Sequence, residues 1–266
     1  MPIYYIGLSL LSNNEPGDNG PRKKRLKTAA RAEARRILSW FNGSPIGDDE
    51  IAREENNRPF FLDHRADFNV SHSGNMAAVS LVKSGIMGKK SNDRSFPSLR
   101  SREVKLRTGI DIELVRPDVK IREIAEEFFT LEERDYIFFH NETSGQTFRG
   151  SDTDIARFFQ IWTLKECFLK LRGFSVLDMR QAPSFIKRNG TSSFEFAFCG
   201  SRSSPISFFL YELTGPNERY TLASDVEGTA KLQPKINWFS QALLPLRSKA
   251  EIKAAHSPEE TVNPKM

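Results

Sequence analysis

Two carboxylates lie two residues apart in the stretch Gly109 to Glu113, whose sequence is Gly-Ile-Asp-Ile-Glu. Because side chains alternate along a β-strand, Asp111 and Glu113 would share one face, about 7 Å apart, and the two isoleucines the other. Such a pair either repels, which raises a pKa, or shares a hard cation such as Mg²⁺ through its oxygens. The simpler alternative is the solvated face of an edge strand, and the spacing alone leaves that alternative open.

A second group of charged residues lies in the strongest helical segment of the chain. Trp162, Glu166 and Lys170 are spaced i, i+4 and i+8, and Lys165 immediately precedes Glu166. Residues so spaced lie on one face of a helix, so a carboxylate and ammonium groups would project beside an apolar seam. The alternative is a Glu-to-Lys pair on a surface helix, which contributes only about 0.2 to 0.5 kcal/mol.

A third group lies in the stretch 67 to 74, Asp-Phe-Asn-Val-Ser-His-Ser-Gly. The hydroxyl of Ser71, the imidazole of His72 and a tight glycine turn could offer several donors to a phosphate. A serine-histidine nucleophile pair is not indicated, because neighbours on a strand point to opposite faces. The alternative is an ordinary hairpin with a solvated histidine.

Periodicity predicts the elements that must position these residues. Apolar residues spaced by threes and fours over 26–41 predict an amphipathic helix with an arginine-rich outer face. Residues 68–83 predict a strand, a turn and a strand, and residues 108–115 predict another strand. Two short helices are expected within 120–139, separated by a capping box of Thr130 and Glu133, and a longer helix over 152–172, closed by Gly173.

The rest of the chain divides into strand-like and polar stretches. Alternation of period two over 194–198, 206–212 and 220–223 predicts an antiparallel meander, and the signals of order fade from about 228 onward. Residues 84–107, rich in Ser, Gly, Lys and Arg, predict a flexible basic surface insertion. The predicted fold class is α+β and pseudo-duplicated, each half a small antiparallel sheet packed by helices, although no residue-level repeat is visible. The expected division is an N-terminal subdomain over 1–115, a C-terminal subdomain over 116–228 and a tail of unknown role over 229–266.

Composition limits the class of protein. Lys plus Arg number 39 against 34 Asp plus Glu, a net charge of +5, which favours anionic partners. The longest apolar runs are a few residues, far below the roughly 18 needed to span a membrane, so no membrane partner is expected. The N-terminal apolar run has no basic residue ahead of it and predicts a strand, not a signal peptide. Cys167 and Cys199 form no C-x-x-C motif, so neither a disulfide framework nor a cysteine zinc site is indicated, and a cytoplasmic location fits.

The motifs, taken in order, resemble the signature of the 4'-phosphopantetheinyl transferases, specifically the larger monomeric type that activates surfactin synthetase and lysine-pathway enzymes. That signature is F-N-x-S-H-S, G-[IV]-D-[IV]-E, F-[FS]-x-x-E and W-[ST]-x-K-E-[AS]-x-x-K. The likeness covers about residues 20 to 180. Cys167 replaces the usual Ala or Ser, and the insertion over 84–107 has no counterpart in the typical member. The matching stretches here are Phe68 to Ser73, Gly109 to Glu113, Phe128-Phe129 with Glu132 and Glu133, and Trp162 to Lys170.

The resemblance implies a set of site residues. Asp111, Glu113 and Glu166 would bind Mg²⁺, which bridges the pyrophosphate of coenzyme A, and charge developing on that pyrophosphate would be neutralised by the metal and by lysines. The phosphate-binding lysines would be Lys165 and Lys170. The nucleotide end, including its 3'-phosphate, would be held by Ser71 and His72, by Arg58, and by the basic cluster around Lys24 and Arg31.

The implied reaction moves the phosphopantetheine arm of coenzyme A onto a serine of an apo acyl or peptidyl carrier protein, which becomes the holo form, and releases 3',5'-ADP. The enzyme would be a cytoplasmic monomer serving fatty acid, polyketide or nonribosomal peptide biosynthesis. A carboxylate, a lysine or metal-bound water would remove the serine proton. Glu133 and Lys170 are the candidate bases, and Glu166 completes the expected catalytic group.

Two functions of other classes compete with this one. Clustered acids and a lysine on a basic protein also suit a Mg²⁺-dependent nuclease or phosphohydrolase, but the compact Glu-x-Lys that many nuclease sites carry after a strand acid does not follow Asp111 and Glu113. A basic module that tracks nucleic acid phosphates along residues 22–36 is the alternative that is not an enzyme. No aromatic residues are interleaved with those charges, so base stacking is unsupported and no nucleic acid partner is expected.

Overall fold

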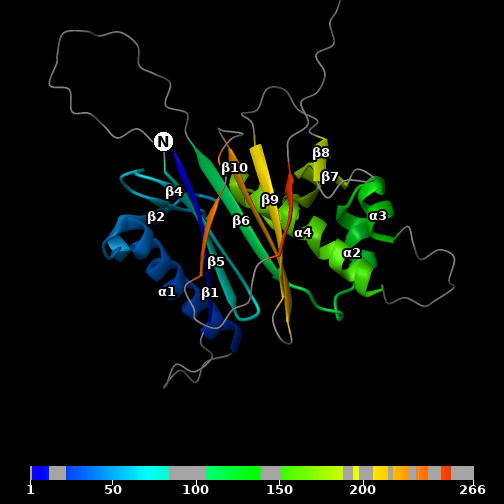
Figure 1. Ribbon diagram of the computed structural model, residues 1–266, viewed down its shortest axis with the longest axis horizontal. Coiled ribbons are helices and arrows are strands. Elements are labelled where there is room, and N and C mark those ends of the chain that lie inside the picture. The colour runs from blue at the N-terminus through cyan, green and yellow to red at the C-terminus, as the bar shows by residue number, and fades with distance from the viewer. Residues whose placement is uncertain are drawn as a thin grey trace, which may run out of the picture.

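Helices and sheets form four successive layers, which Figure 1 shows side by side: helix α1, a first sheet, a second sheet, and a group of helices around α4. An apolar core lies between each pair of neighbouring layers. The core between the sheets joins Tyr4 and Ile6 of the first sheet to Ile110 and Ile112 of the second. This computed structural model describes residues 2–11, 22–83, 106–138, 151–187, 194–197, 206–214, 218–227, 232, 234–238 and 247–252.

The first sheet has the strand order β11-β1-β5-β4, with α1 against its outer face. Its neighbours pair antiparallel, except that β11 runs parallel to β1. The apolar stripe of α1, including Ala34, Ile37 and Leu38, is buried on this sheet. The elements are β1 (Ile3–Leu10), α1 (Arg22–Asn42), η1 (Asp48–Glu50), β2 (Ile51–Arg53), β3 (Pro59–Phe61), β4 (Asp67–Ser73), β5 (Met76–Lys83) and β11 (Lys235–Trp238).

The second sheet has the order β12-β9-β10-β6 and is antiparallel throughout. Helix α4 packs across it and is buried on most of its surface. Ser151 and Asp154 form the capping box at the start of α4, and Gly173, with φ +74°, ends it in the left-handed region. The elements are β6 (Arg107–Leu114), α2 (Ile121–Phe128), α3 (Leu131–Phe138), α4 (Asp152–Arg172), η2 (Val176–Gln181), β7 (Ser184–Lys187), β8 (Phe194–Ala197), β9 (Ile206–Thr214), β10 (Arg219–Glu227) and β12 (Arg247–Ile252).

Most of the predicted elements are confirmed. The α+β class, the hairpin over 68–83, the capping box of Thr130 and Glu133, and the end of the long helix at Gly173 all appear in the structure. Helix α1 begins at Arg22, one turn earlier than the apolar spacing predicted. None of the helices in the described part of the chain is both long and apolar enough to cross a membrane.

Two expectations about the C-terminal part are wrong. β8 pairs with β7 in a separate two-stranded sheet, so the meander consists of β9 and β10 without it. Order does not simply fade after residue 228, because β11 extends the first sheet beside β1 and β12 extends the second beside β9. Both strands pair with distant segments, and local alternation carries no information about such partners.

The proposed division of the chain stays a prediction, and so does the internal duplication. β6, which that division places in the first half, pairs with β10, and β11 of the predicted tail pairs with β1. The insertion expected over 84–107 lies outside the described residues from 84 to 105, and at its end Arg107 begins β6.

Candidate metal and phosphate site

The site is built where β6 crosses α4 at a glycine. A Cβ atom on Gly109 would lie 2.4 Å from the carbonyl oxygen of Cys167 and 3.0 Å from the backbone nitrogen of Leu171. Only glycine therefore lets the strand backbone approach the helix backbone this closely. Asp111 on the strand and Glu166 on the helix consequently face each other across a short gap.

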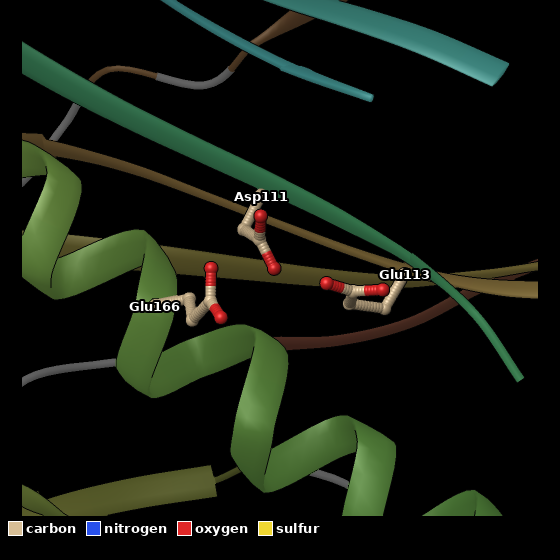
Figure 2. Close-up of side chains that lie close together, drawn as sticks. All are labelled: Asp111, Glu113 and Glu166. Atoms are coloured by element: carbon tan, nitrogen blue, oxygen red, sulfur yellow. The ribbon is translucent and has the colours of Figure 1, made fainter. Parts of the chain in front are cut away.

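Three carboxylates meet at this crossing. One oxygen from each of Asp111, Glu113 and Glu166 lies within 4.8 Å of the others. Figure 2 shows the two strand residues and the helix residue pointing toward one another. The alternation of β6 thus places Asp111 and Glu113 on one face, as predicted, and α4 supplies the third carboxylate from a distant part of the sequence.

Burial and the negative charges of neighbouring carboxylates shift the pKa values of the groups in the cluster. Burial and the charge of Asp111 raise the pKa of Glu113 to about 7 and that of Glu166 to about 8. Burial alone would lower the pKa of Lys170, but the nearby charges of Asp111 and Glu166 raise it to about 12. Three acids with one ammonium group leave an excess of negative charge, which a divalent cation would offset.

Hydroxyl groups of β4 hold two of the carboxylates. Ser71 donates to Asp111 Oδ1 at 2.8 Å, and Ser73 donates to Glu113 Oε2 at 2.8 Å. The same two hydroxyl oxygens accept the backbone N–H groups of Ile112 and Leu114, so serine side chains link β4 to β6. Both carboxylates are therefore oriented before any ligand arrives.

The donor set of the cluster fits a hard divalent cation. Asp111 Oδ2 is buried, and no hydrogen-bond partner reaches it within the described part of the chain. Buried polar oxygens are normally paired, so an unpaired one within a three-carboxylate cluster fits a site that would hold a cation. Mg²⁺ takes oxygen ligands and is commonly held by carboxylates together with substrate phosphates. Asp111, Glu113 and Glu166 can supply the protein's share of that shell.

A basic cavity of about 540 Å³ adjoins the cluster. Lys170 belongs to both, because its Nζ lies 2.5 Å from Asp111 Oδ1 and 2.9 Å from Ser71 Oγ while its side chain lines the cavity. His72 also lines it, and burial, followed by the charges of Lys170 and Lys27, lowers the pKa of His72. The remaining cationic side chains of the lining are Lys27, Arg31, Arg35, Arg53 and Arg58.

Two expected site residues lie elsewhere. The Lys165 ammonium is 3.1 Å from Glu133 Oε2, and neither side chain is more than 1% exposed. Glu133 also accepts the backbone N–H groups of Thr130 and Phe185, and Lys165 donates to the Pro183 carbonyl. The structure therefore does not bring Lys165 or Glu133 to the cluster, and a base role for Glu133 and a phosphate role for Lys165 gain no support from it.

The other expected anion-binding residues divide between the cavity and its surroundings. Arg31 and His72 line the cavity, whereas Lys24, one turn before Lys27, is exposed and lies outside the lining. Arg58 lines the cavity but is 5% exposed, and its guanidinium is held by Asp67 at 2.5 Å and by the carbonyls of Phe68 and Thr108. The Arg58 guanidinium thus links the residue before β3 to β4 and β6, and its two terminal nitrogens already have partners there.

Sequence reasoning missed several contributors. Ser73 orients Glu113, and its position two residues after Ser71 on a strand indicates a face shared by the two serines. Lys27 and Arg35 are spaced from Arg31 by four residues on each side, so helical periodicity could have grouped the three. No sequence signal identified Gly109 as the crossing point.

Comparison with known proteins agrees with this geometry. Residues 107–224 match the model of the 4'-phosphopantetheinyl transferase superfamily. A protein of Haemophilus influenzae, provisionally named a 4'-phosphopantetheinyl transferase, is 32% identical over 137 residues, which are 51% of this chain and 46% of the relative. The 4'-phosphopantetheinyl transferase HetI of Nostoc is 26% identical over 165 residues, 60% of this chain and 57% of the relative.

The chain thus spans about half the length of the curated relatives it matches. The matched segment begins with β6 and ends within β10, so it contains Asp111, Glu113, Glu166 and the glycine crossing that joins them. The family model, the two relatives and the site therefore point the same way. Residues 107–224 are therefore similar to the 4'-phosphopantetheinyl transferase superfamily, and both relatives carry the name of that activity.

Proposed function

We propose that this protein transfers the 4'-phosphopantetheine group of coenzyme A to a serine hydroxyl of an apo carrier protein in a Mg²⁺-dependent reaction. The products are the holo carrier protein and 3',5'-ADP. The observation that carries the proposal is the junction of the three-carboxylate cluster with a cavity lined by cations, with Lys170 shared between them. A diphosphate ester with a further phosphate on its nucleotide needs both features at once.

The cavity supplies the binding part of the mechanism. Lys27, Arg31 and Arg35 project from α1 toward the same space as His72 and Lys170. Cations and an imidazole so placed would bind the anionic nucleotide end of coenzyme A and leave the pyrophosphate at the carboxylate cluster. Because 3',5'-ADP is the leaving group, the same residues would stabilise its charge as the bond to phosphorus breaks.

The cluster supplies the part of the mechanism that neutralises charge. Mg²⁺ bound by Asp111, Glu113 and Glu166 would act as a Lewis acid on the pyrophosphate oxygens. Lys170, whose pKa is raised to about 12, stays protonated near neutral pH, so it acts in this proposal as a cation and not as the base. Phosphoryl transfer places the attacking and leaving oxygens roughly in line, so the carrier serine would approach from the side away from the cavity.

Intact-mass spectrometry tests the proposal directly. The purified protein is incubated with Mg²⁺, coenzyme A and a panel of apo carriers from fatty acid, polyketide and nonribosomal peptide systems. We expect at least one carrier to gain the mass of a single phosphopantetheine, and a carrier with its acceptor serine changed to alanine to gain none. Absence of a gain across the whole panel would overturn the assignment. Release of 3',5'-ADP without carrier modification would favour the alternative of a phosphohydrolase.

The subtype and setting belong to the same proposal. The order of the motifs from Phe68 to Lys170 within one chain supports the larger monomeric type. We expect a monomer in the cytoplasm. Size-exclusion chromatography with light scattering tests the oligomeric state, and a dimer would remove that part of the assignment.

A further inference from the structure

A buried acid on β10 lies at the point where three layers of the molecule meet, outside the segment that matches the superfamily model. Asp225 is 0% exposed and pairs in register with Gly109 of β6. Its Oδ1 accepts the backbone N–H of Gly109 at 2.5 Å. The acid therefore holds the strand at the residue where β6 crosses α4, two positions before Asp111.

The same side chain also faces helix α4. The Cys167 thiol interacts with the Asp225 carboxyl, and that hydrogen bond lowers the pKa of Asp225 against the stronger effect of burial, which raises it. Cys167 is fully buried and immediately follows Glu166. The Asp225 carboxyl thus contacts Gly109, two residues before Asp111, and Cys167, one residue after Glu166.

The backbone of Asp225 connects this point to the first sheet. Its carbonyl accepts the hydroxyl of Thr108 at 2.7 Å and that of Tyr4 at 3.1 Å. Tyr4, which belongs to β1 and is 1% exposed, also donates to Ser224 at 2.7 Å. The residue is therefore fixed from β1, β6 and α4 together, so a change in its side chain cannot be absorbed by a simple shift of one element.

Ordinary packing does not account for an acid at this position. Asp225 forms no salt bridge within the described residues, and its Oδ2 has no hydrogen-bond partner there. Burying a carboxyl without a cationic partner opposes folding, so an apolar residue would be the better choice for stability alone. The feature that the acid does supply is an acceptor aimed at the Gly109 amide beside the metal-ligand strand.

We propose that Asp225 is a positioning residue that fixes the separation of Asp111 from Glu166 by holding Gly109 of β6 and Cys167 of α4 at one point on β10. This inference rests on the proposed function, because it concerns the geometry of the same metal site. It predicts that the affinity for the metal depends on the shape of the acceptor at position 225.

The test measures binding of Mn²⁺ alone, by electron paramagnetic resonance of the free ion, in parallel with kcat and KM for carrier modification. Asp225→Asn keeps an oxygen acceptor of nearly the same shape, and Asp225→Ala removes it. Val226→Ala is the matched control, since Val226 is equally buried on the next position of β10 but faces the core between the sheets. We expect Asp225→Ala to weaken Mn²⁺ binding by at least roughly tenfold, the order of loss found when a residue that supports metal ligands is changed. Asp225→Asn and Val226→Ala should leave the Mn²⁺ affinity nearly unchanged.

Several outcomes would overturn the inference. Wild-type Mn²⁺ affinity in Asp225→Ala would show that the acid does not position the site, and an equal loss in Val226→Ala would show only a general loss of packing. If Asp225→Ala does not fold, Cys167→Ala removes the contact on the helix side, and unchanged Mn²⁺ affinity in that variant counts against the inference. If the wild-type protein binds no Mn²⁺, the metal-site hypothesis is wrong, and the positioning role of Asp225 is wrong with it. The proposed function is tested separately, by whether the wild-type protein modifies the carrier.

Discussion

Two groups of buried charges each take one member from α4, Lys165 in the first and its neighbour Glu166 in the second, and they are built in opposite ways. Lys165 and Glu133 form a pair in which every acceptor oxygen of the acid has a donor. Glu166 joins Asp111 and Glu113 in a cluster of three acids, where Asp111 Oδ2 has no partner among the described residues. The first group is complete without a ligand and the second is not.

The difference shows which buried charges are available for chemistry. A pair with all its hydrogen bonds made gains nothing from a ligand and loses much if one partner is removed. A buried set of like charges opposes folding until a divalent cation binds, because burial first and the charge of Asp111 second raise the pKa values of Glu113 and Glu166. Completeness, more than burial, therefore separates the structural pair from the candidate site.

The largest expected effect comes from the incomplete group. Asp111→Asn keeps an Oδ1 acceptor for Ser71 and Lys170 but replaces the unpaired Oδ2 with an amide that cannot bind a cation. We expect carrier modification to fall at least about 100-fold, the order of loss seen when one electrostatic group is removed from a charged transition state. Intact-mass kinetics measures the change, and a thermal melt serves as the control for folding. Normal turnover in this variant would remove the metal-site model.

The complete group should respond in the opposite way. Glu133→Gln leaves the buried Lys165 ammonium without a carboxylate partner, so we expect the free energy of unfolding to fall by about 3 to 5 kcal/mol, measured by urea denaturation. Mn²⁺ affinity should stay at the wild-type value, because neither residue reaches the cluster. The double variant Glu133→Leu with Lys165→Met, which removes both charges, should recover much of the stability. Loss of carrier modification with unchanged stability would instead return Glu133 to a catalytic role.

The contrast between the two groups also marks how far the sequence could predict the site. Strand alternation placed Asp111 and Glu113 together, and the capping box of Thr130 and Glu133 was visible from spacing alone. Both are local patterns, for which period and residue type are sufficient. The helix and its ending at Gly173 were predicted for the same reason.

Nonlocal packing decided what could not be predicted. Lys165 and Glu166 are neighbours on a helix, and only the arrangement of β7 and α3 on one side and β6 on the other determines which of the two reaches the cluster. The same limit explains the missed pairing of β11 with β1, whose partners are more than 200 residues apart. Motif spacing identified Lys165 as a site residue, and only contacts formed on folding reveal its actual partner.

Asp225 is a further buried acid that sharpens the contrast. Burial raises its pKa from 3.8 to about 7, although the Gly109 N–H and the Cys167 thiol lower it. Because the folded state binds this proton more tightly than the unfolded state, the carboxyl opposes folding progressively as the pH rises from about 4 to about 7. We therefore expect Asp225→Asn to gain stability relative to the wild type by on the order of 2 to 3 kcal/mol between pH 5 and pH 8, from about 1.4 kcal/mol per pKa unit.

Denaturation of both proteins at each pH isolates this carboxyl, since Glu113 and Glu166 titrate equally in the two. The stability advantage of Asp225→Asn over the wild type should grow as the pH rises from about 5 to about 8. A difference in the free energy of unfolding that does not change with pH would mean that Asp225 stays charged in the folded protein. The acid would then resemble Glu133, with its charge compensated, and not the incomplete cluster.

The smallest effect is expected from deletion of residues 88–105 in the basic insertion. This deletion tests whether the Lys165–Glu133 pair or the three-carboxylate cluster depends on segments beyond the crossing of β6 and α4. Residues 88–105 carry few large apolar side chains, so their removal should expose no core. Shortening a loop changes its closure entropy slowly, by about 0.6 kcal/mol for each halving of length, so stability should hardly change. We expect the deletion variant to keep wild-type Mn²⁺ affinity and kcat, with a changed KM only for the carrier, since a basic segment can attract an acidic partner. Unfolding of the variant would show that the insertion completes the core, because the cluster can form only while β6 keeps its place against α4.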